Sequence, residues 1–364
     1  MKLTNGIHRI LKLSVPRCVL VEVRKIERAT KKVSNQFLMR AMRICFKKLV
    51  ITYDADFNSD GTGAQLQRQF GVFVLSRILK CNYQFSPIKN IAVHALDPFQ
   101  SETDYFEFLE KLNHDFEVSC EQGLWSEITA ATRIASPSIY RLIGVGVKSF
   151  FNRGLTLVKV GDPYSITEYF QDTYDEVLPN LLNWSHLAQT QKIKILAIHY
   201  RQGVGGKVIY PGQKIPRELD LGYFIKVIQY IKRIHPATEL KILVLTDAPS
   251  TATTYAPPVS QHKLWENTPG FNNGKMLIAP FDFSPLETLQ CDYKIIAGGN
   301  PIDAIKIMST ADFLLMGRSS LSFVAGVLNQ NGVVFTAPEF WHNSLSRWTS
   351  YTDSVLKSKK DTSK

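Results

Sequence analysis

The sequence predicts an α/β protein of two domains, and three observations support this prediction. The chain has 364 residues, a length that suits two domains of about 150 to 200 residues each. Its second half alternates apolar strand-like runs with helical patterns, an order typical of a parallel sheet covered on both faces. Its first half contains a strand, a glycine-rich turn and a helix in "KKLVITYD", "NSDGTG" and "AQLQRQFGVFVLSRILKC".

We divide the chain into four parts by these patterns and by charge. They are a basic segment (1–48), an N-terminal α/β domain (49–188), a doubly wound C-terminal domain (189–350) and a polar tail (351–364). The polar stretch "SHLAQTQK" marks the boundary between the two domains. The C-terminal strands are expected in "IKILAIHY", "LKILVLTD", "GKMLIAP", "YKIIAG", "DFLLMG" and "GVVFTAP".

The net charge of +11 is concentrated at the N-terminal end. Residues 1–48 contain 13 Lys and Arg against Glu22 and Glu27, and the rest of the chain has 30 residues of each sign. This pattern indicates one or two basic amphipathic helices that suit an anionic membrane surface or an acidic partner. A solvated helical face packed on the body is the alternative. Nucleic acid is an unlikely partner, because few aromatics interleave these charges and the body is neutral.

The compartment expected from the sequence is the cytoplasm. No apolar run reaches the about 18 residues that a membrane span needs, and no signal-peptide core is present. The cysteines are scattered, with no CxxC pair, which argues against a disulfide framework or a zinc site. They are Cys18, Cys45, Cys81, Cys120 and Cys291. The basic segment would suit a peripheral position at the inner face of the membrane.

Candidate site residues lie where strands of the C-terminal domain end, because open parallel sheets bind ligands beyond the carboxyl ends of their strands. Strand alternation places His199 and Arg201 on one face of "AIHYRQGVGG". An arginine there needs an anion, which is either a neighbouring carboxylate or a ligand phosphate. The glycines that follow favour a phosphate, because they let backbone approach it closely.

A second candidate element is the turn in "DFLLMGRSSLSF". A helix beginning near Ser319 and Ser320 would offer hydroxyls and free amides to an anion, although a serine there is also a common helix cap. Arg318 lies in the same turn. Asp247, at the end of "KILVLTD", could accept hydrogen bonds from a ribose or base, or cap a helix.

Three stretches, in this order, resemble motifs of the α-1,2-fucosyltransferase family and its wider fucosyltransferase relatives. They are "DGTGAQLQRQFGVFVLSRIL", "IHYRQG" and "DFLLMGRSSLSFVAGVLNQNGVVFTAPEFWH". The matching positions are Gly61, Gly63, Gln65, Phe70, His199, Arg201, Gly203, Ser319, Ser320, Ser322, Ala337, Pro338 and Trp341. The resemblance covers about residues 50 to 345, and only the three motifs are specific.

The resemblance implies a GT-B-like fold, with two Rossmann-like domains facing a cleft. The N-terminal domain would be the acceptor side, and the C-terminal domain would bind the nucleotide sugar. The implied reaction is an inverting, metal-independent transfer from GDP-fucose, or a related nucleotide sugar, to a hydroxyl of a glycan or lipid-linked glycan. No cofactor is implied, since the donor is itself a substrate.

The resemblance also implies residue roles. Arg201 would hold the donor β-phosphate, Ser319 or Ser320 the phosphates, and the loop 61–65 would come near the sugar or acceptor. The full predicted donor-binding set is Arg201, Asp247, Arg318, Ser319, Ser320, Ser322, Gly61, Gly63 and Gln65.

The chain departs from the family pattern at several of these motifs. Val204, Ala64 and Arg318 replace an aspartate and two asparagines of the family. With Val204 in the acidic position, Asp60 and His199 are the candidate catalytic bases beside Arg201, and the sequence does not choose between them.

Two other functions compete with this interpretation. "DAD" at 54–56 resembles the D-x-D motif of metal-dependent glycosyltransferases, because two carboxylates at a strand end are plausible ligands of a hard cation. The second alternative is a non-catalytic protein of nucleotide-sugar fold with a basic tail that binds a membrane or a partner.

Overall fold

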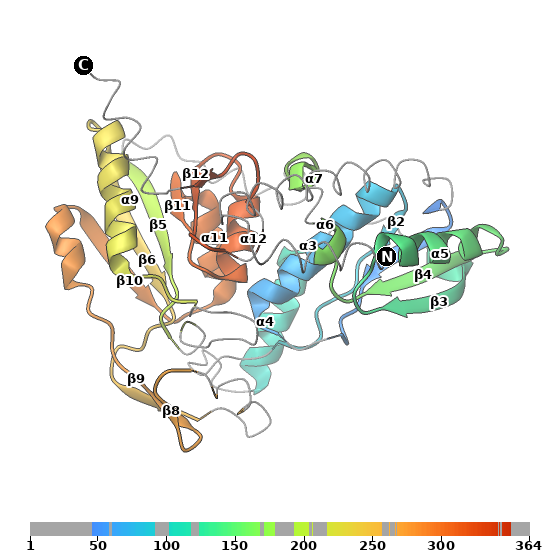
Figure 1. The fold of residues 1–364 in the computed structure, drawn as a ribbon, viewed down its shortest axis with the longest axis horizontal. Coiled ribbons are helices and arrows are strands. Elements are labelled where there is room, and N and C mark those ends of the chain that lie inside the picture. Colours follow the sequence, from blue (N-terminus) through green and yellow to red (C-terminus); the bar gives the residue numbers. More distant parts are fainter. Residues whose placement is uncertain are drawn as a thin grey trace, which may run out of the picture.

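The computed structural model describes residues 46–57, 60–91, 102–117, 124–167, 171–178, 193–203, 206, 217–256, 262, 266, 268–340, 342 and 344–350. The basic segment 1–48 is therefore described only at its last three residues, and the polar tail lies outside the described residues. The described elements form two α/β units, each built on a parallel sheet (Figure 1). The predicted fold class, an α/β protein with two Rossmann-like units, is confirmed; the exact domain boundaries stay predictions.

The first unit contains a four-stranded parallel sheet in the order β2-β1-β4-β3. Its strands are β1 (Leu49–Tyr53), β2 (Asn82–Gln84), β3 (Ile128–Ile134) and β4 (Leu155–Val160). Every residue of β1 is buried, as expected for a central strand whose two faces are both covered.

Helices connect and cover these strands. They are α3 (Thr62–Leu79), α4 (Glu102–Asp115), α5 (Ile139–Phe150), α6 (Tyr164–Thr167) and α7 (Gln171–Val177), with a 3-10 turn, η2 (Leu124–Glu127), before β3. The predicted order of strand, glycine-rich turn and helix is confirmed by β1 and α3. The sequence prediction missed β2 and β3, and it assigned no helix to α5.

The second unit contains a six-stranded parallel sheet in the order β10-β6-β5-β11-β12-β13. Its strands are β5 (Ile193–Tyr200), β6 (Glu239–Thr246), β10 (Asp292–Ala297), β11 (Phe313–Leu315), β12 (Val333–Thr336) and β13 (Thr349–Ser350). Numbered along the chain, this is the order 3-2-1-4-5-6 of the Rossmann fold. The strand order reverses between β5 and β11.

Three capped helices belong to this unit. They are α9 (Leu221–Ile234), α11 (Pro301–Thr310) and α12 (Ser320–Leu328). Asp220, Asn300 and Ser319 each accept a hydrogen bond from a backbone amide in the first turn of their helix. Such side-chain caps fix where a helix begins.

One predicted parallel strand was wrong. "GKMLIAP" forms β9 (Lys275–Ile278), which pairs antiparallel with β7 (Thr253–Tyr255) and β8 (Phe271–Asn272) in a separate three-stranded sheet. Asn273 and Gly274 connect β8 to β9 with φ of 49° and 73°. Asn-Gly is the usual pair for such a two-residue hairpin turn, so the signal was present in the sequence. After β9 the chain forms a 3-10 helix, η5 (Ser284–Leu289).

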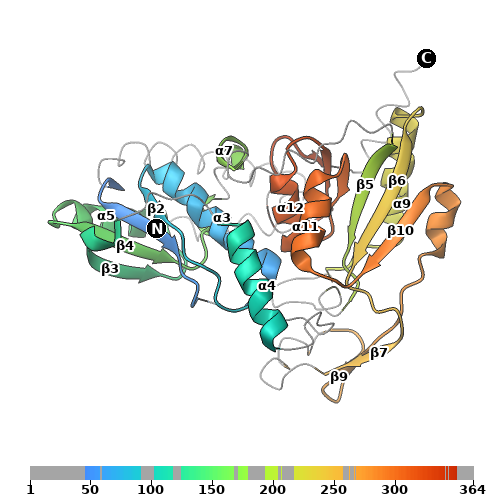
Figure 2. The ribbon, with the colours of Figure 1, turned by 180° about the vertical axis from the view of Figure 1, so that it is seen from behind.

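The hydrophobic core is continuous between the two units. One cluster of buried side chains includes Phe70 and Val74 of α3 together with Val324 of α12 and Met316. Helix α3 packs against β1 and also against α12, and the two helices lie side by side in both Figure 1 and Figure 2. Because both sides of α3 are covered, apolar residues are buried all around it.

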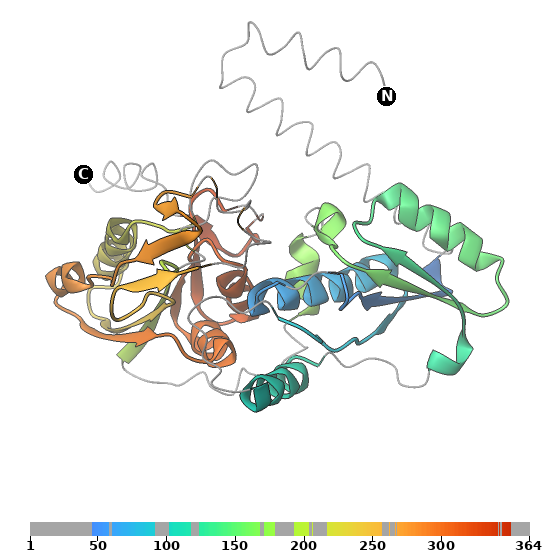
Figure 3. The ribbon, with the colours of Figure 1, turned by 90° about the horizontal axis from the view of Figure 1, so that it is seen from below.

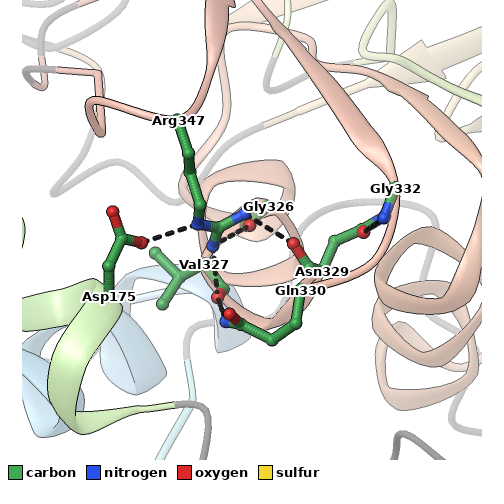
Figure 4. A network of polar contacts seen from close by, with 7 residues as sticks. All are labelled: Asp175, Gly326, Val327, Asn329, Gln330, Gly332 and Arg347. Carbon is green, nitrogen blue, oxygen red and sulfur yellow. Dashed lines mark hydrogen bonds and ion pairs between the residues drawn. The ribbon is translucent and has the colours of Figure 1, made fainter.

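An arginine also joins the two units (Figure 4). Nε of Arg347 lies 2.6 Å from Oδ1 of Asp175 in α7, and its Nη1 donates to the carbonyl of Asn329 at 2.6 Å. Its Nη2 donates to the carbonyls of Gly326 and Val327 at 3.1 and 2.9 Å. Arg347 thus satisfies carbonyls at the C-terminal end of α12, where a cation is favourable.

Within the described part of the chain, no helix has both the length and the apolar character that crossing a bilayer requires.

Candidate functional site

The candidate site lies where β5 and β11 end, at the point where the strand order of the second sheet reverses. The side chains of β5 alternate as predicted, because Ala197 belongs to the core cluster shared with the first unit and Ile198 and Tyr200 to the cluster on the other face. Sheets of this order bind ligands at this position.

Arg201 is the central cation of this site. Its Nη1 donates a hydrogen bond of 3.1 Å to Oγ of Ser319. Among the described residues Arg201 forms no ion pair, and its buried Nε has no hydrogen-bond partner. A guanidinium stays charged in any protein environment, so a partly buried one without a carboxylate is a binding group for an anion.

The serines of the turn between β11 and α12 have three different environments. Oγ of Ser319 accepts from the amide of Leu321 at 3.2 Å as well as from Arg201, so the cap and the arginine partner are the same hydroxyl. The hydroxyl of Ser320 bonds to no described residue. That of Ser322 is fully buried and donates to the carbonyls of Gly317 and Ser319 at 2.9 and 3.0 Å. Ser322 therefore stabilises the turn itself.

Asp247 fixes the loop that follows Arg201. Its Oδ1 accepts from the amides of Gln202 and Gly203 at 2.9 and 2.8 Å. A Cβ at Gly203 would lie 2.3 Å from the carbonyl oxygen of Asp247, so only glycine fits there. Asp247 thus caps no helix, and its Oδ2 has no partner in the described part of the chain. Val204 lies outside the described residues.

Arg318 is occupied within the protein, which differs from its predicted role in donor binding. Its Nε and Nη1 donate to the carbonyls of Pro338 and Glu218 at 2.9 and 3.3 Å, and its Nη2 pairs with Glu339 at 3.2 Å. These bonds hold the guanidinium against the loop after β12, so we leave Arg318 out of the proposed phosphate site.

The glycine-rich turn 60–65 meets the start of α12. A Cβ at Gly63 would lie 2.3 Å from the amide nitrogen of Leu321 and 2.8 Å from the carbonyl carbon of Ser320. Gly63 therefore allows the N-terminal ends of α3 and α12 to pack closely against each other. Gln65 is fully buried, with its amide bonded to the hydroxyl of Tyr53 and to the carbonyl of Asn90. That side chain supports the first unit and faces no solvent.

Asp60, a candidate base, belongs to a different cluster from Arg201. Its Oδ2 pairs with Nη2 of Arg68 at 2.8 Å, and its Oδ1 accepts from the amide of Gly61 at 2.9 Å. The sequence analysis missed Arg68. Asp60 lies on a turn, and Arg68 lies eight residues later on the helix that follows it. This spacing is the feature of the sequence that could have indicated the pair.

The same cluster continues to the second unit. The rings of Tyr164 and His342 are centred 4.7 Å apart. Burial, followed by the positive charges of Arg217 and Arg68, lowers the pKa of His342 to about 3. No pattern in the sequence pointed to these residues.

His199, the other candidate base, is neutral at pH 7. Burial, followed by the charge of Arg201, lowers its pKa to about 4, and Asp247 opposes this shift. The side chain is 8% exposed, and its Nδ1 has no partner among the residues the structure describes. Neutral His199 leaves Arg201 as the positive charge at the end of β5.

The two carboxylates of "DAD" do not converge. Asp54 is buried and bonds to Nε of Arg133, and Asp56 pairs with Lys89 at 3.2 Å. Within the described ranges no group of three His, Cys, Asp or Glu is placed to hold a metal ion. This geometry disfavours the D-x-D interpretation.

Comparison with solved structures found similar chains of low identity. A crystal structure of POFUT1 in complex with GDP is 10% identical, with a TM-score of 0.34 over 79% of this chain and 97% of that one. E. coli heptosyltransferase WaaC with ADP-2-deoxy-2-fluoro heptose is 7% identical, with a TM-score of 0.32 over 86% and 98%. A glycosyl transferase of family 9 from Veillonella parvula DSM 2008 is 12% identical, with a TM-score of 0.32 over 88% and 92%. No family model and no curated protein matches the chain.

Proposed function

We propose that this chain is a glycosyltransferase whose nucleotide-sugar donor binds at the ends of β5 and β11. The observation that carries the proposal is the hydrogen bond between Arg201 and Ser319, made by a guanidinium with no carboxylate partner in the described residues. The donor diphosphate would be held by Arg201, by the hydroxyl of Ser320 and by the first amides of α12. Helix N-termini and guanidinium groups both bind phosphate oxygens well.

The chemistry that this site would perform follows from where charge develops. The bond between the anomeric carbon and the diphosphate breaks, the acceptor oxygen attacks that carbon from the opposite face, and the diphosphate leaves with its bonding electrons. A fixed guanidinium stabilises that leaving group without a metal ion, which is the form of transfer we propose. The acceptor proton passes to a base, for which His199 and Asp60 remain the candidates.

The order of the three motifs supports the finer proposal of a fucosyl donor. The stretches that resemble the fucosyltransferase family meet in space, because Gly63 of the first motif packs on Leu321 of the third, and Arg201 of the second bonds to Ser319. We propose GDP-fucose as the donor and a glycan hydroxyl as the acceptor.

A thermal-shift panel with GDP, UDP, CDP, ADP and their sugars, in the presence of EDTA, tests the proposal. A nucleotide at about 100 times its Kd adds about 2.7 kcal/mol to the free energy of unfolding. We expect GDP to raise the Tm of the wild type and of the control Arg233→Ala, an exposed arginine on α9, but not of Arg201→Ala.

Transfer assays with GDP-fucose extend this test. Arg201→Ala should lower the rate by about a hundred- to a thousand-fold, the usual loss when one charge-stabilising group is removed. A wild type that responds to no nucleotide, or an Arg201→Ala variant that responds fully, contradicts the proposed site. A response to UDP or ADP alone would keep the site and reject the fucosyl donor.

A further inference from the structure

Helix α5 lies on an outer side of the first unit, away from the second unit (Figure 3). It carries an exposed apolar stripe. The stripe, here named the α5 face, consists of Tyr140, Gly144, Val147 and Phe151. Spacings of four, three and four residues place these positions on one side of a helix. Tyr140 is 79% exposed, Val147 36% and Phe151 78%, and nothing lies within 4 Å of a Cβ built at Gly144.

Within α5 and the turn that follows it, only positive charges flank the α5 face, while Glu127 of η2 lies beside Gly154. Arg141, Lys148 and Arg153 are exposed, and residues 139–154 contain no Asp or Glu. Aromatic side chains beside lysine and arginine on one helix are typical of contact with the headgroup region of an anionic membrane.

The basic segment 1–48 enters the body at the end of α5. Nζ of Lys48 donates to the carbonyls of Phe150 and Asn152 at 3.1 and 2.6 Å, and the hydroxyl of Ser149 donates to the carbonyl of Lys48 at 3.2 Å. Residues 1–48 carry a net charge of +11, and Lys48, where this segment joins the described body, lies at the end of α5.

We propose that the α5 face, together with the exposed cations beside it, is a docking surface for an anionic lipid bilayer. The exposed aromatics would enter the headgroup region while the surrounding cations pair with lipid phosphates. If the basic segment itself covered the α5 face, two positively charged surfaces would meet, which is unfavourable. Nucleic acid is a poorer occupant, because Gly144 and Val147 in the middle of the stripe have no ring on which a base could stack.

Co-sedimentation of the full chain with vesicles of phosphatidylcholine, with and without phosphatidylserine, tests this proposal. We expect binding to the mixed vesicles, and a partition coefficient about tenfold lower for the double variant Tyr140→Ser/Phe151→Ser, because two exposed rings lose their burial in lipid. Gly144→Glu should also weaken binding, because it places a negative charge in the stripe. It meets no steric obstacle.

Matched controls separate the α5 face from the basic segment and from folding. Gly144→Ala adds no charge at the same position, and Leu277→Ser removes a 67% exposed apolar side chain from the second unit. Both should bind as the wild type does, and no variant should have a lower urea midpoint than the wild type, because the changed side chains are exposed.

Three outcomes overturn the proposal. The first is that the double variant and Gly144→Glu bind mixed vesicles like the wild type, which would assign all binding to the basic segment. The second is that phosphatidylcholine alone binds equally well. The third is that the variants lose affinity for a DNA or RNA oligonucleotide but not for vesicles.

Discussion

Replacing Gly63 by alanine tests whether the contact between the starts of α3 and α12 is as close as the structure shows. The added Cβ would lie 2.3 Å from the amide nitrogen of Leu321, 2.6 Å from its Cα and 2.8 Å from the carbonyl carbon of Ser320. These are backbone atoms of a second helix, and ordinary contact begins at 3.4 Å, so one helix must move by about 1 Å.

The expected net effect is a loss of stability. Overpacking of this kind costs about 1 to 3 kcal/mol, whereas alanine gains at most about 1 kcal/mol over glycine from helix propensity. We therefore expect Gly63→Ala to lower the free energy of unfolding by about 1 to 2 kcal/mol. The movement would also displace Ser319 and Ser320, so a nucleotide should raise the Tm of the variant less than that of the wild type.

Urea unfolding at equilibrium measures this effect, and Gly144→Ala on α5 is the matched control. Nothing lies within 4 Å of a Cβ there, so only the propensity gain of up to about 1 kcal/mol applies and stability should rise. A Gly63→Ala variant as stable as the wild type, with an unchanged m-value, would refute the packing argument.

Two further predictions concern buried histidines and the arginine between the units. The lowered pKa values of His199 and His342, about 4 and about 3, mean that the unfolded chain takes up protons first as the pH falls below 6.5. The free energy of unfolding should therefore fall by up to about 1.4 kcal/mol per pH unit for each histidine between pH 6.5 and 4.5. Urea midpoints at pH 7, 6 and 5 measure this slope; glutamine at both positions should remove it, and a flat wild-type profile would contradict it. Arg347→Ala should cost at least about 2 kcal/mol by leaving Asp175 and the carbonyls of Gly326 and Asn329 without this donor; the carbonyl of Val327 keeps Gln330. Asp175→Asn should cost less because an acceptor remains. A loss within about 0.5 kcal/mol for Arg347→Ala, measured by urea unfolding, would show that the contact is not stabilising.

The second unit was predictable because its central strands are largely buried on both faces. Apolar runs such as "IKILAIHY" and "KILVLT" are typical of buried parallel strands, and glycine or a polar cap follows most of them. In the first unit β2 has three residues and β3 alternates between half-buried and exposed positions, so neither stands out locally. Gly144 and Gly146 obscured the helical pattern of α5.

Part of the site was predictable for a topological reason. The rule that ligands bind where strand order reverses brought Arg201 and Ser319 together across 118 residues. The surroundings of Arg318 could not be predicted, because its partners Glu218 and Glu339 come from loops 100 and 21 residues away. The local sequence shows that a charged residue is present. It does not show which distant segment will neutralise that charge.

The position of α3 limits how this protein can be divided for experiments. A fragment ending near residue 188 would keep α3 but lose α12, which covers one of its sides in the intact chain. The uncovered strip would include Phe70 and Val74, and an apolar strip of that kind promotes aggregation. Soluble expression of either half alone is therefore expected to require polar substitutions on the surface where the halves were separated.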